Sequence, residues 1–300
     1  MSIRAPKSVR GTKPTTEGAG VKLQRAFGFG NTSEFDPFLL LDDFRNENPN
    51  DYLAGFPWHP HRGIETITYV LAGSVEHGDS LGNKGSLRAG DVQWMTAGSG
   101  IMHQEMPQGD PGGRMHGFQL WANLPSALKM TKPRYQDIAA AAIPEVTDDD
   151  GTKVRIICGE FWGQRGPVEG VAADPQYLDV WVPPGQHKRL AIDYSRKAFA
   201  YVFAGGGTFR DASDPQAVRN ELADMTAPTA ADVHNRSLVL FDSGDEIAVR
   251  AGDEGIRFLL VSGKPIEEPV AWYGPIVMNT EDQLRQAIAE LRTGTFIRER

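Results

Sequence analysis

The sequence predicts an all-β protein made of two tandem barrels. The chain has 300 residues, which is long for a single hydrophobic core and suits two domains. Its 33 glycines and 20 prolines favour short strands joined by tight turns, because glycine permits positive φ and proline presets turn geometry. Matched landmarks in the two halves indicate that one barrel has been duplicated.

Stretches rich in β-branched and aromatic residues, bounded by Gly, Pro, Asn or Asp, run through the whole chain. In the first half they predict strands at 38–41, 65–71, 91–95 and 118–121. In the second half they predict strands at 154–157, 177–182, 198–203, 237–241 and 257–261.

The landmarks that repeat are two short motifs in the same order. Residues 69–73 read YVLAG and answer to YVFAG at 201–205, while AGSGI at 97–101 resembles AGDEGI at 251–256. A glycine turn precedes each second landmark, at 89–91 and at 243–245. We therefore expect a first barrel at 1–140 and a second at 141–300, with the linker within 139–151.

Three further segments carry local signals. Thr280 and Gln283 form a capping box, followed by an apolar stripe at helical spacing that predicts a short C-terminal helix packed on a barrel: Leu284, Ala287, Ile288 and Leu291. The polar stretch between Gly205 and Ser237 predicts a surface loop or short helix. The first thirteen residues hold only basic charges, which predicts a solvated N-terminal extension, at Arg4, Lys7, Arg10 and Lys13.

Bulk composition narrows the function classes. A formal net charge of −8 disfavours a large phosphate-binding surface, so we expect no direct contact with nucleic acid. Cys158 is the only cysteine, so we expect a reducing compartment and read this residue as a small buried hydrophobe. No apolar run approaches the roughly 18 residues that span a bilayer, and the N-terminus lacks a signal peptide's apolar core. We expect a soluble cytoplasmic protein, present also in the nucleus if the source is eukaryotic.

Two short motifs carry the chemistry. His59 and His61 project from the same face of a strand, and Pro60 between them favours an edge position. Forty-two residues beyond His61, His103 and Glu105 form a second pair at the same spacing. Three imidazole nitrogens and one carboxylate that converge in a small barrel suit Fe(II), Mn(II), Ni(II), Cu(II) or Zn(II). Because histidine ligands must be neutral, occupancy should fall below about pH 6.

The four ligand candidates differ both from the remaining histidines and from the matching positions of the second half. Isolated histidines are typical of ordinary polar residues, here His77, His116, His187 and His234. Aligning the repeated landmarks places mostly apolar side chains opposite the four ligand candidates, namely Ala191, Asp193, Phe258 and Leu260. We therefore expect one metal ion, in the first barrel only.

These motifs resemble the two cupin motifs and, more specifically, the pirin family. The resemblance covers nearly the whole chain and is carried by DPFLL at 36–40, HPHRG at 59–63, QWMTAG at 93–98, HQEMP at 103–107, HGFQLW at 116–121 and GPIVMNT at 274–280. It implies a bicupin, that is, two double-stranded β-helix (jelly-roll) barrels with one iron held by His59, His61, His103 and Glu105. Other cupins take the carboxylate four residues after the second histidine, here Glu65, and spacing alone leaves Glu65 open.

The resemblance also implies an activity. Some pirins are quercetin 2,3-dioxygenases, in which a flavonol bound through its 3-hydroxyl oxygen reacts with O2 and releases carbon monoxide. Glu105 is the candidate general base for that hydroxyl proton. Pirins are also iron-dependent, redox-sensitive regulators that bind a transcription factor or another protein, which is the alternative function. A third reading is a metal-stabilised barrel with an unknown small-molecule substrate.

Four residues near the motifs have open roles. His116 and Gln119 lie three apart, so a straight strand turns at most one of them toward the metal, where it would orient a ligand imidazole. Phe56 and Trp58 precede the first histidine pair and are read as core residues, with an aromatic pocket as the alternative.

Overall fold

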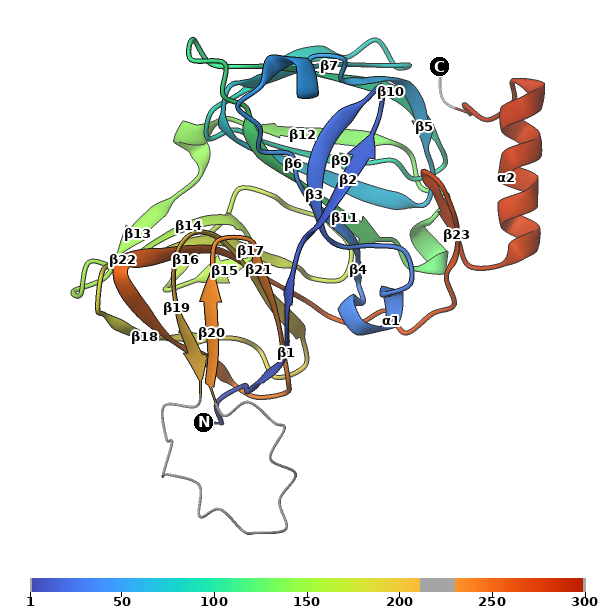
Figure 1. Cartoon of the computed structure of the whole chain (residues 1–300). Coiled ribbons are helices and arrows are strands. Elements are labelled where there is room, and N and C mark those ends of the chain that lie inside the picture. Colours follow the sequence, from blue (N-terminus) through green and yellow to red (C-terminus); the bar gives the residue numbers. More distant parts are fainter. Residues whose placement is uncertain (1, 211–229, 299–300) are drawn as a thin grey trace. The chain divides into compact units, whose positions relative to one another are not determined.

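The computed structural model describes residues 2–210 and 230–298, and the chain divides into two compact units (Figure 1). We call residues 12–143, 167–174 and 265–300 the first barrel, and residues 1–11, 144–166 and 175–264 the second barrel. Strands dominate both units, which confirms the predicted all-β, two-barrel fold. The nine strands predicted from sequence texture all occur.

The units do not follow the predicted division at residue 140. Strand β1 (Pro6–Gly11) belongs to the second barrel, because it pairs with β21 (Ser237–Phe241) at an edge of the sheet there. The C-terminal segment from residue 265, with helix α2 (Glu281–Thr293), belongs instead to the first barrel. In both cases a terminal segment packs with residues far away in the sequence, and local sequence patterns do not predict such pairing.

The first barrel is formed by two sheets. The larger has the order β12 (Arg134–Ile138), β9 (Val92–Thr96), β6 (Ile64–Ala72), β11 (His116–Asn123), β4 (Phe38–Asp43), β3 (Val21–Phe27) and β2 (Lys13–Glu17). The smaller has the order β5 (Phe56–His61), β10 (Ile101–Gln108), β7 (Ser74–Asp79) and β8 (Lys84–Arg88). The short elements of this unit are α1 (Thr32–Phe35), the 3₁₀ turns η1 (Pro49–Asp51), η2 (Ser126–Leu128) and η3 (Ala140–Ala142), and the hairpin β23 (Ala271–Tyr273) with β24 (Ile276–Met278).

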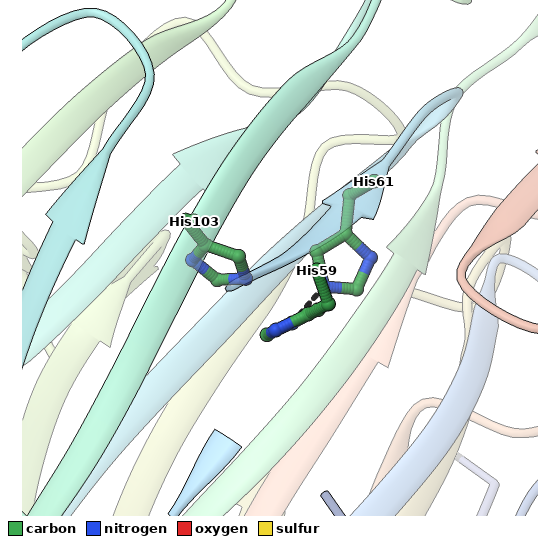
Figure 2. Close-up of side chains that lie close together, drawn as sticks. All are labelled: His59, His61 and His103. Carbon is green, nitrogen blue, oxygen red and sulfur yellow. Dashed lines mark hydrogen bonds between the residues drawn. The ribbon is translucent and has the colours of Figure 1, made fainter. Parts of the chain in front are cut away.

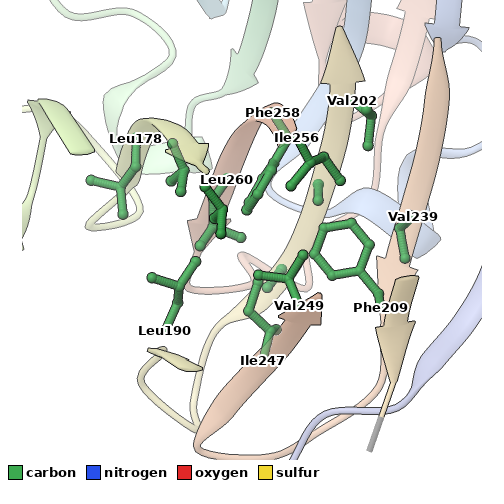
Figure 3. Close-up of a cluster of buried hydrophobic side chains, with 14 of the residues drawn as sticks. Leu178, Leu190, Val202, Phe209, Val239, Ile247, Val249, Ile256, Phe258 and Leu260 are labelled. Atoms are coloured by element: carbon green, nitrogen blue, oxygen red, sulfur yellow. The ribbon is translucent and has the colours of Figure 1, made fainter. Parts of the chain in front are cut away.

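The second barrel is one large sheet around an apolar core. Its main path runs β1, β21, β19 (Lys197–Arg210), β22 (Glu246–Gly263), β17 (Gln176–Val182), β14 (Lys153–Cys158) and β13 (Glu145–Thr147). Off this path, β18 (His187–Ala191) pairs with β22 and β20 (Ala230–His234) pairs with β19. The hairpin of β15 (Glu160–Phe161) and β16 (Gln164–Arg165) is a separate two-stranded sheet. Figure 3 shows part of the core, including Leu178, Leu190, Phe209, Ile247 and Phe258. Cys158 is buried, as predicted.

The N-terminus does not form the solvated extension that its basic residues suggested. Arg4 is only 2% exposed, and its guanidinium donates to the backbone carbonyls of Gly244 (2.8 Å), Asp242 (3.2 Å) and Asp193 (2.9 Å). Satisfying the donors with carbonyl oxygens offsets the desolvation of this charge. The predicted extension was therefore wrong.

The C-terminal helix confirms its sequence signals. The Thr280 side chain accepts from the Gln283 backbone N–H, and the Gln283 side chain accepts from the Thr280 backbone N–H. Leu284 and Ala287 are buried against β23 and β24, whereas Leu291, expected on the same face, is 37% exposed. No helix in the described ranges is long and apolar enough to cross a membrane. The predicted insertion after Gly205 falls mainly on residues 211–229, outside the described residues.

Strand pairing corrects the alignment of the repeat. Tyr69 pairs with Phe118 of β11, whereas Tyr201 pairs with Leu259 of β22. The C-terminal half of β22, which carries Phe258 and Leu260, is therefore the counterpart of β11 and not of β10. The counterpart of β10 is the N-terminal half of β22, which pairs with β18 as β10 pairs with β5.

The equivalences drawn for Phe258 and Leu260 were thus wrong, whereas Ala191 lies on β18, the counterpart of β5, and Asp193 lies beyond the end of that strand. The apolar character of the second barrel nevertheless holds. Ile247 and Val249 of β22 and Leu190 of β18 are buried in its core. No group of potential metal ligands occurs among the described residues of this barrel.

Candidate metal centre

Strands β5 and β10 bring three histidines together inside the first barrel. His59 lies directly opposite His103, and His61 lies opposite Ile101, in the antiparallel pairing of the two strands. The ring centroids of His59 and His103 are 4.4 Å apart, and that of His61 lies 4.9 Å from each. Figure 2 shows the three rings turned toward a common centre. Within the described ranges they form the only group of three or more His, Cys, Asp and Glu side chains whose ligand atoms all lie within 4.8 Å of one another.

The turn after His61 depends on Gly63. Its φ is +77°, and a Cβ at this position would lie 1.9 Å from the Val277 carbonyl oxygen. Only glycine accepts this conformation and this approach without displacing the backbone. The chain therefore leaves β5 at His61 and enters β6, in the other sheet, at Ile64.

That turn separates Glu65 from the histidines. Because β5 and β6 are different strands, the i, i+4 spacing from His61 no longer places both side chains on one face. The Glu65 carboxyl is buried and accepts a hydrogen bond from the Thr96 hydroxyl at 2.7 Å. Glu65 is not part of the histidine group.

Backbone carbonyls set the tautomers of two imidazoles. His59 Nδ1 lies 2.8 Å from the Pro57 carbonyl oxygen, and His61 Nδ1 lies 3.2 Å from that of Pro275. A carbonyl oxygen only accepts, so each Nδ1 carries the hydrogen and each Nε2 presents a lone pair. The two Nε2 atoms are 3.1 Å apart. Two lone pairs facing each other at this distance repel unless a cation lies beside both.

His103 is a buried imidazole whose two ring nitrogens lack hydrogen-bond partners among the described residues. Its exposed fraction is only 1%. A buried imidazole without partners is unfavourable, and a metal ion would satisfy it. Three neutral nitrogens are ligands that borderline divalent cations accept readily.

Burial keeps these three imidazoles neutral. Desolvation lowers the pKa of His61 and of His103 well below 6.5, and the neighbouring imidazoles lower both further. Desolvation also lowers the pKa of His59, although its bond to the Pro57 carbonyl opposes the shift. Neutral imidazole is the form that binds metal.

Glu105 lies on the same strand but outside the group of three. A register shift in the pairing of β10 with β5 separates it from His103. Its carboxyl accepts a hydrogen bond from the Thr68 hydroxyl at 3.0 Å, and burial raises its pKa from 4.5 to about 7. The structure therefore brings His59, His61 and His103 together and holds Glu105 on the adjoining cavity wall.

Thr68 links Glu105 to Gln119. The Thr68 Oγ1 lies 2.6 Å from the Gln119 side-chain oxygen and 3.0 Å from Glu105 Oε1. One hydroxyl carries one proton, so it cannot donate to both oxygens. The Gln119 amide therefore turns so that its NH2 group donates to Thr68, which leaves the Thr68 hydroxyl proton for Glu105.

A cavity of about 610 Å³ opens beside the histidines, a size that suits a drug-sized ligand. His59, His61, Glu105 and Gln119 line it, together with an aromatic set formed by Phe29, Phe56, Trp58, Trp121 and Trp272. Trp58 is 52% exposed, so reading it as a core residue was wrong. Phe56 both lines the cavity and packs on a buried cluster.

His116 does not line this cavity, whereas Gln119 does. The His116 ring lies beside Phe118, and its Nε2 is 3.8 Å from an Asp43 carboxylate oxygen. Sequence reasoning missed Trp121, Trp272 and the Pro275 carbonyl. Only Trp121 carried a local signal, because it shares a strand face with Gln119.

Comparisons with known proteins decide the family. The Pirin family model matches residues 20–122, and the Pirin C-terminal cupin domain model matches residues 177–297. The chain belongs to the pirin family. A pirin-like protein of Caulobacter vibrioides is 43% identical over 297 residues, covering 99% of this chain and 100% of the relative. A pirin-like protein of Solanum lycopersicum is 40% identical and covers 93% of this chain and 88% of the relative.

Among solved pirin-like folds, one belongs to a quercetin 2,3-dioxygenase from Acinetobacter baumannii. It is 29% identical to this chain, covers 98% of this chain and 99% of its own, and superposes with a TM-score of 0.85. The resemblance to pirins and to cupins drawn from the sequence motifs is therefore confirmed.

Proposed function

We propose that this pirin is a metal-dependent dioxygenase that cleaves a flavonol of the quercetin type. One transition-metal ion, with Fe(II) favoured over Mn(II), Ni(II), Cu(II) or Zn(II), would be held by His59, His61 and His103, with Glu105 as the fourth ligand. The observation that carries this proposal is the pair of Nε2 lone pairs 3.1 Å apart beside a cavity of about 610 Å³. The similarity to a quercetin 2,3-dioxygenase over 98% of the chain supports the reaction class.

When bound, the metal would supply a Lewis acid for an enolic oxygen and a binding position for O2. The chain would supply the rest. The Glu105 carboxylate would accept the proton of the 3-hydroxyl group, and Thr68 would hold that carboxylate in place through its hydroxyl.

The aromatic side chains suit a planar ligand. The Trp121 ring lies edge-on to His61 at 5.1 Å and 6.0 Å from Trp272, which in turn meets Phe29 at 5.5 Å. Such a set offers apolar faces to a flat ring system beside the metal ligands.

Oxygen uptake tests the proposal directly. The protein is reconstituted anaerobically with Fe(II), and O2 consumption and carbon monoxide release are then measured with and without quercetin. We expect flavonol-stimulated uptake with about one carbon monoxide released per O2 consumed, and its loss in His59→Ala. No stimulated uptake across several flavonols would contradict the proposal and favour the non-enzymatic regulator.

A further inference from the structure

A row of polar side chains crosses the sheet face that lines the cavity. Thr68 of β6 lies opposite Gln119 of β11, Gln119 lies opposite Asp42 of β4, and Asp42 lies opposite Arg25 of β3. All four residues line the cavity. Neighbouring strands are about 4.8 Å apart, so Asp42 lies about 10 Å from Thr68 across the sheet and Arg25 about 14 Å. The row therefore begins beside Glu105, which accepts from Thr68, and ends three strands away at Arg25.

The far end of the row is an ion cluster. The Arg25 guanidinium donates through Nε (2.8 Å) and NH2 (2.7 Å) to the two oxygens of Asp42, and its NH1 lies 3.0 Å from a Glu17 carboxylate oxygen. The Asp42 side chain is 7% exposed, that of Arg25 24% and that of Glu17 42%. The cluster thus passes from the cavity wall toward solvent.

A contribution to folding stability does not account for this ion cluster. Several of its cavity-lining neighbours are apolar, namely Val21, Leu23 and Leu40. A buried ion pair gains little or nothing over an apolar pair of the same size, because desolvation of both charges offsets their attraction. Its place in the wall of a ligand-sized cavity is better explained by a ligand.

The charges of the cluster indicate the kind of group that it binds. Two carboxylates and one guanidinium leave a net charge of −1, which repels a carboxylate on the ligand and suits a neutral donor such as a phenolic hydroxyl. The guanidinium has five N–H groups, and its contacts with Asp42 and Glu17 use three of them. The cluster can therefore both accept from one hydroxyl and donate to another.

We propose that Arg25, Asp42 and Glu17 form a distal subsite that binds the hydroxyl groups on the ring of the substrate remote from the metal. This inference rests on the proposed function and narrows its substrate class to flavonols that carry hydroxyl groups on the pendant phenyl ring. Quercetin has two adjacent hydroxyls on that ring, and galangin has none.

Anaerobic binding titrations of Fe(II)-loaded protein with quercetin and galangin test the subsite without requiring turnover. We expect the wild type to bind quercetin about tenfold more tightly than galangin, the effect of about one hydrogen bond to a charged group. Asp42→Asn should remove most of this preference by weakening quercetin binding, with galangin affinity unchanged within about twofold. Asp43→Asn is the matched control, because Asp43 is the adjacent ion-paired carboxylate of β4 and does not line the cavity. Glu17→Gln, at an exposed strand end, provides a second variant if Asp42→Asn fails to fold.

The outcomes separate the two proposals. A quercetin preference that persists unchanged in Asp42→Asn, or in Glu17→Gln where Asp42→Asn does not fold, overturns the subsite even if the enzyme turns over. A preference that disappears with the variant supports the subsite even if no flavonol is cleaved. Failure of the wild type to bind either flavonol overturns both.

Discussion

Hydrogen bonds to backbone carbonyls decide what His59 and His61 can bind. Because Pro57 and Pro275 each accept from an Nδ1–H, the Nε2 atoms of both rings are left as lone pairs that point at each other. The sequence predicted that these side chains share a strand face, but it could not predict the tautomers. The Pro275 carbonyl lies 214 residues beyond His61 along the chain.

Glu105→Gln should reduce turnover far more than metal content. The amide keeps the size of the side chain and can still bond to Thr68, but it cannot take up a proton. We expect kcat with quercetin to fall by about 100-fold or more, in line with typical losses of a general base, while bound iron stays within about twofold. Glu65→Gln, a second buried glutamate outside the histidine group, is the control. Full activity in Glu105→Gln would show that the base assignment is wrong.

Asp42 should make the first barrel less stable as pH rises from about 4 to about 6. Burial raises the pKa of this carboxyl from 3.8 to about 6, although Arg25 opposes the shift. The folded state then holds the proton more tightly than the unfolded chain, so each pH unit in this window costs up to about 1.4 kcal/mol. Relative to Asp42→Asn, which does not titrate, the wild type should lose about 2–3 kcal/mol across the window. Urea unfolding of both proteins at pH 4, 5, 6 and 7 measures the difference, and a flat difference would contradict the shift.

At the scale of the elements, their positions could be predicted from the sequence, but their partners could not. Strand positions were predictable, because β-branched and aromatic runs between turn residues are a local signal. The capping box of α2 was predictable for the same reason. Register and partner choice were not, because β22 continues through the landmark at 251–256, whereas the matching stretch at 97–101 of the first half is the turn between β9 and β10 and the first residue of β10. Burial of Arg4 was likewise hidden, since its carbonyl partners are distant in the chain.

Lys129 links the C-terminal segment to the turn between β5 and β6 and to β11. Its Nζ donates to the Gly63 carbonyl (2.9 Å), the Asn123 side-chain oxygen (2.7 Å) and the Val277 carbonyl (3.1 Å), and burial lowers its pKa to about 7. Lys129→Met should leave these oxygens buried without a donor and destabilise the first barrel by about 3–5 kcal/mol. Thermal unfolding measures the loss, with exposed Lys84→Met as the control. An unchanged melting temperature in Lys129→Met would refute this role.

At the scale of the whole molecule, the two barrels differ in what fills them. Three histidines that could hold a metal ion lie inside the first barrel, whereas Ile247, Val249 and Phe258 are buried in the core of the second. The fold of each barrel was predictable from strand texture and from family motifs. The apolar interior of the second barrel was also predictable, although the particular residues that fill it were not.

Metal removal should therefore act on one barrel only. A ligand present at 1,000 times its Kd stabilises the folded state by about 4 kcal/mol, and a chelator removes this contribution. In hydrogen-exchange mass spectrometry, we expect a chelator to reduce protection in peptides that cover β5 and β10, and not in those that cover β18 and β22. Equal loss of protection in both barrels, or no loss in either, would contradict a metal site confined to the first.

Metal stoichiometry of freshly purified protein tests the central claim most directly. Elemental analysis should find about one transition-metal ion per chain in the wild type and almost none in His59→Ala or His103→Ala. His187→Ala, which removes an exposed histidine of β18, should retain the full amount. A metal content that is unchanged in both His59→Ala and His103→Ala would show that these imidazoles do not hold the ion.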